Sequence, residues 1–383
     1  MKKNILFVVD NLVMGGVTRV LINLLNLLDY SKYNIDLLVL HNHDTMQISI
    51  PPNVGIINGN KFYDVMDEPI KKLINSKKIG KIIKKFFFAF LIKTGLMKSV
   101  LKKHRNKFHK KVYDIEIGFC DGFSHLYVSV GKAPLKIAWL HSDVKVKNYS
   151  SRYTNILINA LKKIDYAIAV SKKVGEAYKE IYKIKDYIVI PNTINTKEII
   201  SKSCEFNPFN NIDNSKIIVS VGRLDYSKNY EMLINIHKKL IESGSNIKTY
   251  IVGEGHERKK LETLVKKLNV EDSLYLVGEK QNPYPYIKNA DLFALTSRYE
   301  GLPTVILEAL ILKTPCISTN VAGVNSLLKE NYGYIANNFN DFYEKIHDII
   351  ENKNLLGIYK SNLVYYFYDN NSIIKQIETI FDL

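Results

Sequence analysis

Cysteine is scarce in this sequence, and its spacing excludes two kinds of structural site. The 383 residues include three cysteines, which are Cys120, Cys204 and Cys316. No Cys-x-x-Cys pair occurs, so neither a disulfide framework nor a structural zinc site is expected. This usage is typical of a reducing compartment. We therefore expect a cytoplasmic protein.

Long hydrophobic runs are also missing. The longest, from Phe86 to Ile92, is far short of the ~20 residues that a membrane-spanning helix needs. Near the amino terminus, the apolar run Ile5–Val9 ends at Asp10, which makes it too short for the core of a signal peptide. It is better interpreted as a first buried strand.

Acidic residues are absent from one long segment. Between Lys71 and Lys111 the sequence has fifteen Lys or Arg residues and no Asp or Glu, whereas the net charge of the whole chain is +16. Nearly all of the excess charge therefore belongs to residues 71–111. Helical spacing places two sets of side chains on opposite faces here: Ile79, Ile82, Ile83, Phe86 and Phe87 on one, and Lys77, Lys78, Lys81, Lys84 and Lys85 on the other.

A basic amphipathic helix without acidic residues is typical of a surface anchor on anionic lipid. Two alternatives remain open, a core helix with a solvated basic face and a segment that binds nucleic acid phosphates. No recognised nucleic-acid-binding motif occurs, and the apolar face is large. We favour peripheral association with an anionic membrane, at the inner face of the cell membrane, and no nucleic acid partner.

The rest of the chain has a globular composition and a regular alternation of elements. Its 383 residues exceed one ordinary core, and 46% are hydrophobic. Several apolar runs are continuous, as parallel strands covered on both faces require. The expected strands are Asn4–Val9, Ile35–Leu40, Val54–Ile57, Tyr113–Phe119, Leu135–Leu140, Tyr166–Val170, Tyr187–Ile190, Lys216–Val221, Thr249–Val252, Leu274–Val277, Leu292–Leu295 and Cys316–Ser318.

Strands that alternate with helices predict an α/β fold of two Rossmann-like domains, each a doubly wound parallel sheet, facing a cleft. We assign residues 1–195 to the first domain, 196–214 to a polar linker and 215–365 to the second domain. Residues 366–383 form a terminal helix that packs back toward the first domain. Ligands of such sheets bind beyond the carboxyl ends of the strands.

Two carboxylates, Glu300 and Glu308, follow the expected strand Leu292–Leu295. Pro303 suits the first position of a helix that starts between them. At 1.5 Å per residue, the eight positions from one acid to the other correspond to about 12 Å, roughly the reach of a sugar, a diphosphate and a ribose.

Three backbone N–H groups lie at the start of the same helix, those of Leu302, Thr304 and Val305. Helix N-termini carry unsatisfied donors and attract anions. The stretch therefore suits a nucleotide-sugar. The alternative from spacing alone is that Glu300 caps the helix dipole and Glu308 is a solvated surface residue.

Two further strand ends carry groups suited to a diphosphate. Arg223 and Lys228 follow Lys216–Val221, and guanidinium and ammonium groups both bind phosphate. Glu254 lies in a Gly253-Glu254-Gly255 turn after Thr249–Val252, where glycines permit close approach of the backbone to a ligand. This turn is not the Gly-x-Gly-x-x-Gly fingerprint, so a nicotinamide cofactor is not indicated.

Residues 221–334 resemble the donor domain of retaining glycosyltransferases of family 4, which adopt the GT-B fold. The resemblance rests on six motifs in order: Gly222-Arg223-Leu224 with Lys228-Asn229, Val252-Gly253-Glu254-Gly255, Ala290-Asp291-Leu292, Glu300-Gly301-Leu302-Pro303, Leu307-Glu308-Ala309 and Thr314-Pro315. Lys313 and Asn325-Ser326 depart from the family pattern, which has Gly before the Thr-Pro pair and Pro-Glu in the later loop. The second departure bears on the identity of the donor sugar.

The resemblance implies a role for each matching residue. Arg223 and Lys228 would hold the donor diphosphate, Glu308 the ribose hydroxyls, and Glu300 would contact the donor sugar near its reacting carbon. Glu254 and the N-terminal helix donors complete the donor site. The donor would be a nucleotide diphosphate-sugar with uridine as its nucleoside.

The first domain resembles the same family at two places. Gly15-Gly16 lies just before the expected apolar helix Val20–Leu28, and in the family this loop contacts donor phosphate or acceptor, although Thr18 stands where the family has Glu. His141 ends the strand Leu135–Leu140, and a histidine at the matching place lies close to the donor sugar. We expect His141 to be catalytic, with Asp143 orienting it, and Gly16 to contact the donor.

The sequence thus predicts a retaining hexosyltransferase that acts on a lipid-linked or membrane-near acceptor in the synthesis of a cell-surface polysaccharide or glycolipid. No Asp-x-Asp motif is present, so we predict metal-independent catalysis without a cofactor, with cations and helix N-termini stabilising the leaving diphosphate. Alternatives are a nucleotide-sugar 2-epimerase of similar fold and a catalytically silent scaffold that binds membrane or nucleic acid.

Overall fold

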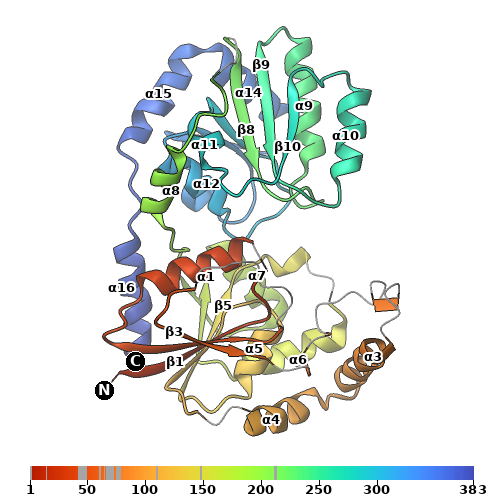
Figure 1. The fold of residues 1–383 in the computed structure, drawn as a ribbon, viewed down its shortest axis with the longest axis vertical. Coiled ribbons are helices and arrows are strands. Elements are labelled where there is room, and N and C mark those ends of the chain that lie inside the picture. Colours follow the sequence, from red (N-terminus) through yellow and green to blue (C-terminus); the bar gives the residue numbers. More distant parts are fainter. Residues whose placement is uncertain are drawn as a thin grey trace. The chain divides into compact units, whose positions relative to one another are not determined.

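The computed structural model describes residues 2–13, 15–41, 50–59, 62–63, 65, 73–74, 79–108, 111–146, 149–210 and 214–383. The chain divides into two compact units. Unit 1 comprises Met1–Ile194 and Asn370–Leu383, and unit 2 comprises Asn195–Asp369. Each unit is built around its own parallel sheet (Figure 1).

The sheet of unit 1 has seven strands in the order β3-β2-β1-β4-β5-β6-β7. Its inner strand β1 is buried from Ile5 to Val9, as a strand covered on both faces should be. The elements of unit 1 are β1 (Lys3–Val9), α1 (Gly16–Leu27), β2 (Tyr33–Val39), β3 (Val54–Asn58), α3 (Ile79–Thr94), α4 (Met97–Phe108), β4 (Ile115–Gly118), α5 (Phe123–Ser129), β5 (Leu135–Leu140), the 3-10 turn η1 (Val144–Val146), α6 (Ser151–Leu161), β6 (Tyr166–Ala169), α7 (Lys172–Tyr182), β7 (Ile188–Val189) and α16 (Asn370–Phe381).

The sheet of unit 2 has six strands in the order β10-β9-β8-β11-β12-β13. Its core includes Leu233 and Ile236 of one helix and Phe342 and Ile346 of another. The elements of unit 2 are α8 (Thr196–Ser203), β8 (Lys216–Val221), α9 (Tyr230–Glu242), β9 (Ile247–Val252), α10 (Arg258–Lys267), β10 (Leu274–Gly278), α11 (Tyr284–Lys288), β11 (Leu292–Leu295), α12 (Thr304–Ile311), β12 (Cys316–Thr319), α13 (Val324–Leu327), β13 (Gly333–Ala336), α14 (Phe339–Glu351) and α15 (Lys353–Val364).

The predicted α/β fold is confirmed, because both sheets are parallel and doubly wound. All twelve predicted strands are present, with ends displaced by at most two residues. Strand β13 was not predicted, since its four residues Gly333–Ala336 are short and only partly buried.

Each sheet reverses its strand order at one point. The reversal falls between β1 and β4 in unit 1 and between β8 and β11 in unit 2. These pairs are parallel, so their carboxyl ends lie along one edge of the sheet. Ligands of doubly wound sheets bind beyond such a reversal. The loops after β8 and β11 therefore occupy the expected ligand position of unit 2.

The segment 196–214 is not the plain linker that its polar composition predicted. Its first residues form α8, which belongs to unit 2 and buries Ile199. The helix is capped by Asn195, whose side chain accepts the Glu198 N–H at 3.1 Å. An Asn followed three residues later by Glu is a helix-start signal that the prediction did not use. Residues 211–213 lie outside the described part of the chain.

The terminal helix α16 belongs to unit 1. Its Phe381 ring lies 5.7 Å from that of Tyr33 in an edge-to-face contact. At its start, the Asn370 side chain accepts the Ile194 N–H at 3.0 Å and donates to the Ile194 carbonyl at 2.7 Å. The predicted residues 366–383 thus contain a helix that completes the first unit.

The basic segment forms α3 and α4, orange in Figure 1. Helix α4 is attached to the sheet by a buried ion pair, in which Arg105 Nη2 lies 2.5 Å from Glu116 Oε1. Burial raises the pKa of Glu116, and the neighbouring Arg105 opposes that shift. Lys77 and Lys78 fall outside the described residues. Within the described part, no helix is both long and apolar enough to cross a membrane.

One buried histidine makes the stability of unit 2 depend on pH. His237 on α9 has Nδ1 2.9 Å from Thr249 Oγ1 and Nε2 2.8 Å from Ser273 Oγ. Burial lowers the pKa of His237 to about 4. An exposed histidine in the unfolded chain titrates near ~6.5, so between these values the unfolded chain binds the extra proton. Stability must therefore fall as the pH falls.

We predict that unit 2 loses about 1.5 kcal/mol of unfolding free energy between about pH 6.5 and about pH 5, and that His237→Gln flattens this dependence. The single tryptophan, Trp139, lies in unit 1, so hydrogen exchange of the α9 and β9 amides is the suitable measurement. His256→Gln, at an exposed histidine of the same unit, is the control. Equal pH dependence in both variants would contradict the assignment.

Candidate active site

The loops after β8 and β11 are held side by side by two hydrogen bonds. The Arg298 N–H donates to the Ser227 carbonyl at 2.7 Å. The Thr296 hydroxyl donates to the Lys228 carbonyl at 3.0 Å. Because each bond ends on the backbone of the other loop, the loops cannot separate without losing both. The candidate site of unit 2 starts from this junction.

Lys228 and Glu300 meet at the junction. Their Nζ and Oε1 atoms are 2.5 Å apart, and the side chains are 18% and 15% exposed. The Ser297 hydroxyl donates to the same oxygen of Glu300 at 2.7 Å. Partial burial makes such a pair stronger than a surface ion pair, because water screens it less. The structure thus brings together the predicted phosphate-binding cation and the predicted sugar-contacting carboxylate.

Local backbone features allow Lys228 to fold back toward Glu300. A Cβ atom on Gly222 would lie 2.9 Å from the Tyr230 hydroxyl and 3.2 Å from Lys228 Cε, so glycine leaves the space that the lysine occupies. Asn229 has φ of 53°, the left-handed conformation that asparagine tolerates. This turn starts α9 directly after Lys228.

Arg223 remains open to solvent in the same loop. Its side chain is 80% exposed, and its Nε lies 3.6 Å from Asp225 Oδ2. Asp225 also accepts the Ser227 N–H at 2.9 Å and so shapes the turn. The Arg223 guanidinium is therefore available to an anion at the carboxyl end of β8.

The glycines flanking Glu254 allow two backbone segments to pack closely together. The sequence had instead predicted that they allow a ligand to approach the backbone. A Cβ atom on Gly253 would lie 1.9 Å from the Gly222 carbonyl oxygen, and one on Gly255 would lie 2.3 Å from that of Leu224. The close approach is thus between two backbones. Glu254 itself lies 2.5 Å from Arg258 Nη1, an ion pair one helical turn apart at the start of α10.

Helix α12 starts later than the sequence predicted. Pro303 is the residue before the helix, and Thr304 and Val305 open it after the buried Leu302. Glu308 is consequently the fifth helical residue, just over one turn along, and not two turns from the start. Residues 300–303 precede the helix, so a rise of 1.5 Å per residue does not apply to them. The expected separation of about 12 Å between Glu300 and Glu308 therefore does not follow from helical geometry.

Glu308 is buried, with 3% of its surface exposed. A buried carboxylate is costly unless it is hydrogen bonded or paired. The alternative in which Glu308 is a solvated surface residue is therefore wrong. Thr304 and Val305 are the first residues of the same helix, and Leu302 lies just before its N-cap Pro303.

Gly16 opens α1 in unit 1, at the carboxyl end of β1. A Cβ atom there would meet nothing within 4 Å, so the fold does not require glycine at this position. The Thr18 hydroxyl donates to the Val13 carbonyl at 2.7 Å and closes the preceding loop. Thr18, which stands where the family has Glu, therefore acts on the loop backbone.

His141 follows β5 in unit 1 and is 7% exposed. Its backbone N–H donates to Asp121 Oδ1 at 3.0 Å, and the same oxygen accepts the Tyr178 hydroxyl at 2.6 Å. The expectation that Asp143 orients His141 is not met, because Asp143 Oδ1 accepts the Lys145 N–H at 3.0 Å and shapes its own turn. Asp121, after β4, fixes the His141 backbone instead.

Sequence reasoning missed four residues around these sites: Ser297, Tyr226, Asp121 and Tyr178. Ser297 precedes Glu300 by three positions. At this spacing a hydroxyl can reach a carboxylate within one turn of the chain, so the sequence alone could have indicated Ser297. The Arg298 guanidinium lies 4.4 Å over the Tyr226 ring, a cation–π contact between the two loops. Asp121 and Tyr178 are far apart in sequence, and only the sheet order brings them together.

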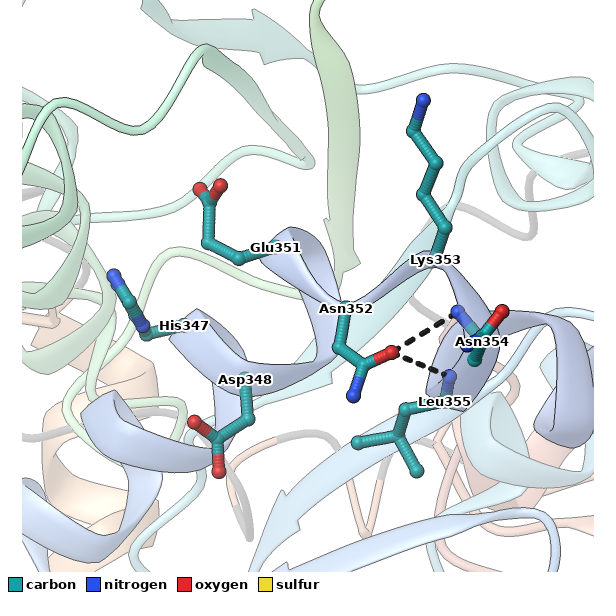
Figure 2. Close-up of a pocket in the computed structure, with 7 residues that line it drawn as sticks. All are labelled: His347, Asp348, Glu351, Asn352, Lys353, Asn354 and Leu355. Carbon is teal, nitrogen blue, oxygen red and sulfur yellow. Dashed lines mark hydrogen bonds between the residues drawn. The ribbon is translucent and has the colours of Figure 1, made fainter.

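An open hollow elsewhere in unit 2 lies where α14 meets α15. Figure 2 shows its lining residues, with the Asn352 side-chain oxygen accepting the N–H groups of Asn354 and Leu355. Asp348 and Glu351 line it too, and their negative charge opposes a diphosphate. None of the predicted donor-site residues lines this hollow.

Among the described residues, no group of three or more His, Cys, Asp or Glu side chains is arranged to hold a metal ion. Metal-independent catalysis itself stays a prediction.

Residues 202–363 match the family described as glycosyl transferases group 1. An uncharacterized glycosyltransferase of Haemophilus influenzae is 27% identical over 369 residues, 93% of this chain and 92% of that protein. The N-acetylgalactosamine-N,N'-diacetylbacillosaminyl-diphospho-undecaprenol 4-alpha-N-acetylgalactosaminyltransferase of Campylobacter jejuni is 29% identical over 221 residues, 56% of this chain and 59% of that protein. Among solved structures, Anabaena HepE in complex with UDP and glucose has a TM-score of 0.71 at 16% identity, and the match covers 100% of both chains.

The two Rossmann-like units and the likeness to solved structures define a protein of the GT-B fold. Residues 202–363 are similar to the group 1 glycosyl transferases, and the chain is similar over 93% of its length to an uncharacterized glycosyltransferase. The predicted GT-B fold is thereby confirmed, and the match of residues 202–363 supports the predicted kind of enzyme.

Substitutions at Gly253 of unit 2 and Gly16 of unit 1 test the structural roles given to these two glycines. We predict that Gly253→Ala lowers the free energy of unfolding by about 2–4 kcal/mol, because the added Cβ overlaps the Gly222 backbone at a φ of 150°. Gly16→Ala should change it by less than about 0.5 kcal/mol, because nothing lies near the added atom. Urea unfolding followed by circular dichroism measures both. Equal destabilisation would contradict the different roles given to the two glycines.

Proposed function

We propose that the chain is a retaining, metal-independent glycosyltransferase that moves a sugar from a nucleotide diphosphate-sugar to a lipid-linked or membrane-near acceptor. Uridine diphosphate is the proposed nucleotide. The observation that carries the proposal is the contact between Lys228 and Glu300 at the point where the sheet of unit 2 reverses its strand order.

The contact suits a donor site because it can be exchanged for contacts with a substrate. Lys228 and Glu300 neutralise each other across 2.5 Å. A diphosphate that binds beside Lys228 takes over its hydrogen bonds, as phosphate oxygens are strong acceptors. Glu300, still held by Ser297, is then an acceptor for a sugar hydroxyl. One ion pair thereby gives two substrate contacts.

The leaving group of the reaction is a nucleoside diphosphate, on which negative charge develops. Arg223 and Lys228 lie in the loop after β8, and the N-terminal N–H groups of α12 lie in the loop after β11. Positioned cations and backbone donors stabilise such charge without a divalent metal. Glu308, buried on α12, is the proposed acceptor for the ribose hydroxyls.

The residues of unit 1 receive their roles from the resemblance together with their places at the strand ends. We assign His141 to the donor sugar and Gly16 to donor phosphate or acceptor. Asp121 holds the backbone of His141, so it is a positioning residue. Retention of configuration is proposed from the likeness to family 4.

Lipid-linked acceptors are supported by the relatives. The Campylobacter jejuni enzyme is named for a diphospho-undecaprenol acceptor, and the Anabaena structure holds UDP and glucose. The positive charge of residues 71–111 supports the same conclusion, since an anionic surface attracts it. We propose peripheral association with the inner face of the cell membrane, where the protein meets both a cytoplasmic donor and a membrane-bound acceptor.

We predict that Lys228→Ala and Glu300→Gln each lower the rate of sugar transfer by at least about a hundredfold, because each removes a group aimed at the developing charge or the donor sugar. The double variant should lose little more than either single variant, since the two groups act on one donor. The measurement is the release of nucleoside diphosphate together with the appearance of glycosylated acceptor.

A matched control is Lys238→Ala, which removes a lysine from an ion pair with Glu242 on the surface of α9. It should keep full activity. Wild-type activity in either Lys228→Ala or Glu300→Gln would reject the donor site. Release of free sugar without any acceptor would favour the 2-epimerase, and failure of the wild-type protein to bind any nucleotide-sugar would favour the silent scaffold.

A further inference from the structure

Helix α3 turns its apolar side chains outward. Ile79, Ile83, Phe86, Phe87 and Phe90 are 69%, 64%, 60%, 45% and 53% exposed. Four of them, at positions 79, 83, 86 and 90, follow the 4-3-4 spacing that places side chains on one face of a helix. We call these five side chains the α3 stripe. Water-exposed phenylalanines in such a row are unusual for a surface that stays in water.

Three lysines of α3, those at positions 81, 84 and 85, lie on the opposite, protein-facing side. Lys81, Lys84 and Lys85 are only partly exposed, and Lys85 Nζ donates to the Val65 carbonyl at 2.9 Å. The alternative of a core helix with a solvated basic face is therefore wrong. The physical reason is that unit 1 offers carbonyl acceptors where α3 docks.

The helix is firmly attached along that inner side. Phe88 is 5% exposed, and its ring lies 4.9 Å from that of Phe62. Leu91 is buried as well, and Arg152 of α6 donates to the Lys93 carbonyl at 3.2 Å. Figure 1 shows α3 at the edge of unit 1, where it packs on α4 and α6. The α3 stripe is thus presented by a fixed helix.

Charge decides what can cover the α3 stripe. The fifteen cations of residues 71–111 have no acidic residue among them, so the stripes of two copies would bring together two strongly positive segments. Five side chains of one helix also fall short of the ~800 Å² per partner of a stable protein interface. An anionic lipid surface suits both the apolar α3 stripe and the positive charge around it, since it accepts apolar side chains and attracts cations.

We propose that α3 lies in the membrane interface with the α3 stripe inserted among the lipid chains, while the exposed Lys93, Lys102 and Lys103 remain at the headgroups. The inference deepens the proposed membrane association and rests on it. Insertion of the phenylalanine and isoleucine side chains then holds the protein at the membrane. The cations attract the protein to the anionic surface from a distance. The lipid-linked acceptor would then meet unit 1 beside an embedded helix.

The test is sedimentation of the full chain with vesicles of phosphatidylcholine and about 30% phosphatidylglycerol, an anionic content within the range that attracts basic segments. Phe86→Ser combined with Phe90→Ser should weaken partitioning by at least about tenfold, because it removes two inserted rings. The control is Phe367→Ser, at a phenylalanine of unit 2 that is 78% exposed, and it should bind as wild type.

Salt separates the two forces. Raising sodium chloride from about 0.1 M to about 0.5 M should weaken wild-type binding but leave measurable partitioning, because screening acts on the cations and not on the inserted rings. Complete loss of wild-type binding at high salt would overturn the inference in favour of purely electrostatic attachment. Wild-type partitioning by the double variant would overturn it as well.

A second measurement does not depend on removing the rings. An environment-sensitive fluorophore at Phe90→Cys, in a Cys204→Ser background because Cys204 is exposed, should shift to the blue on adding vesicles. No shift would contradict insertion. Wild-type self-association that the double variant abolishes would instead assign the α3 stripe to a second copy of the chain.

Transfer to a short, water-soluble acceptor without vesicles separates this inference from the proposed function. The wild type and the double variant should be equally active there, whereas transfer to a vesicle-bound acceptor should fall only in the variant. Absence of transfer by both proteins in both formats would reject the proposed function, whatever the vesicle binding. Equal activity with a vesicle-bound acceptor would reject a role for the α3 stripe in reaching it.

Discussion

The candidate chemistry depends on the junction between the loops that follow β8 and β11. Two hydrogen bonds join these loops, one from the Arg298 backbone and one from the Thr296 hydroxyl, at the point where the sheet of unit 2 reverses its strand order. Without that junction, Lys228 and Glu300 would be two exposed charges on separate loops. With it, they form a partly buried pair held by Ser297. Glycine at position 222 and the left-handed Asn229 serve the same arrangement.

Unit 1 follows the same plan with different chemistry at its strand ends. Asp121, after β4, accepts from the His141 backbone and from the Tyr178 hydroxyl, so it fixes the residue that follows β5. Gly16 opens α1 with no neighbour to require a glycine. On the outside of this unit, α3 is docked by its lysine-bearing side and presents phenylalanines instead. The proposed donor site and the proposed membrane contact therefore belong to separate parts of the fold.

Strand positions could be predicted because continuous apolar runs of four to seven residues identify buried parallel strands with few alternatives. The contacts of individual side chains could not. Whether a Gly-x-Gly turn approaches a ligand or another backbone depends on the loop beside it, as Gly253 illustrates. The start of α12 was misplaced because proline suits the residue before a helix as well as its first position.

The sequence left the orientation of α3 open between a membrane anchor and a core helix, and the cause is general. Helical spacing divides side chains into two faces, but it does not say which face docks when unit 1 offers carbonyl groups to a lysine. Asp121 and Glu308 show a similar limit: the first was missed since its partners are distant in sequence, and the burial of the second required the packing of α12.

Hydrogen exchange measured with and without uridine diphosphate tests the central claim most directly, because it requires neither the donor sugar nor the acceptor to be known. The account predicts protection in residues 222–229 and 298–308, the two joined loops with the start of α12. Unchanged exchange in both loops, or protection confined to the hollow at residues 347–355, would contradict it.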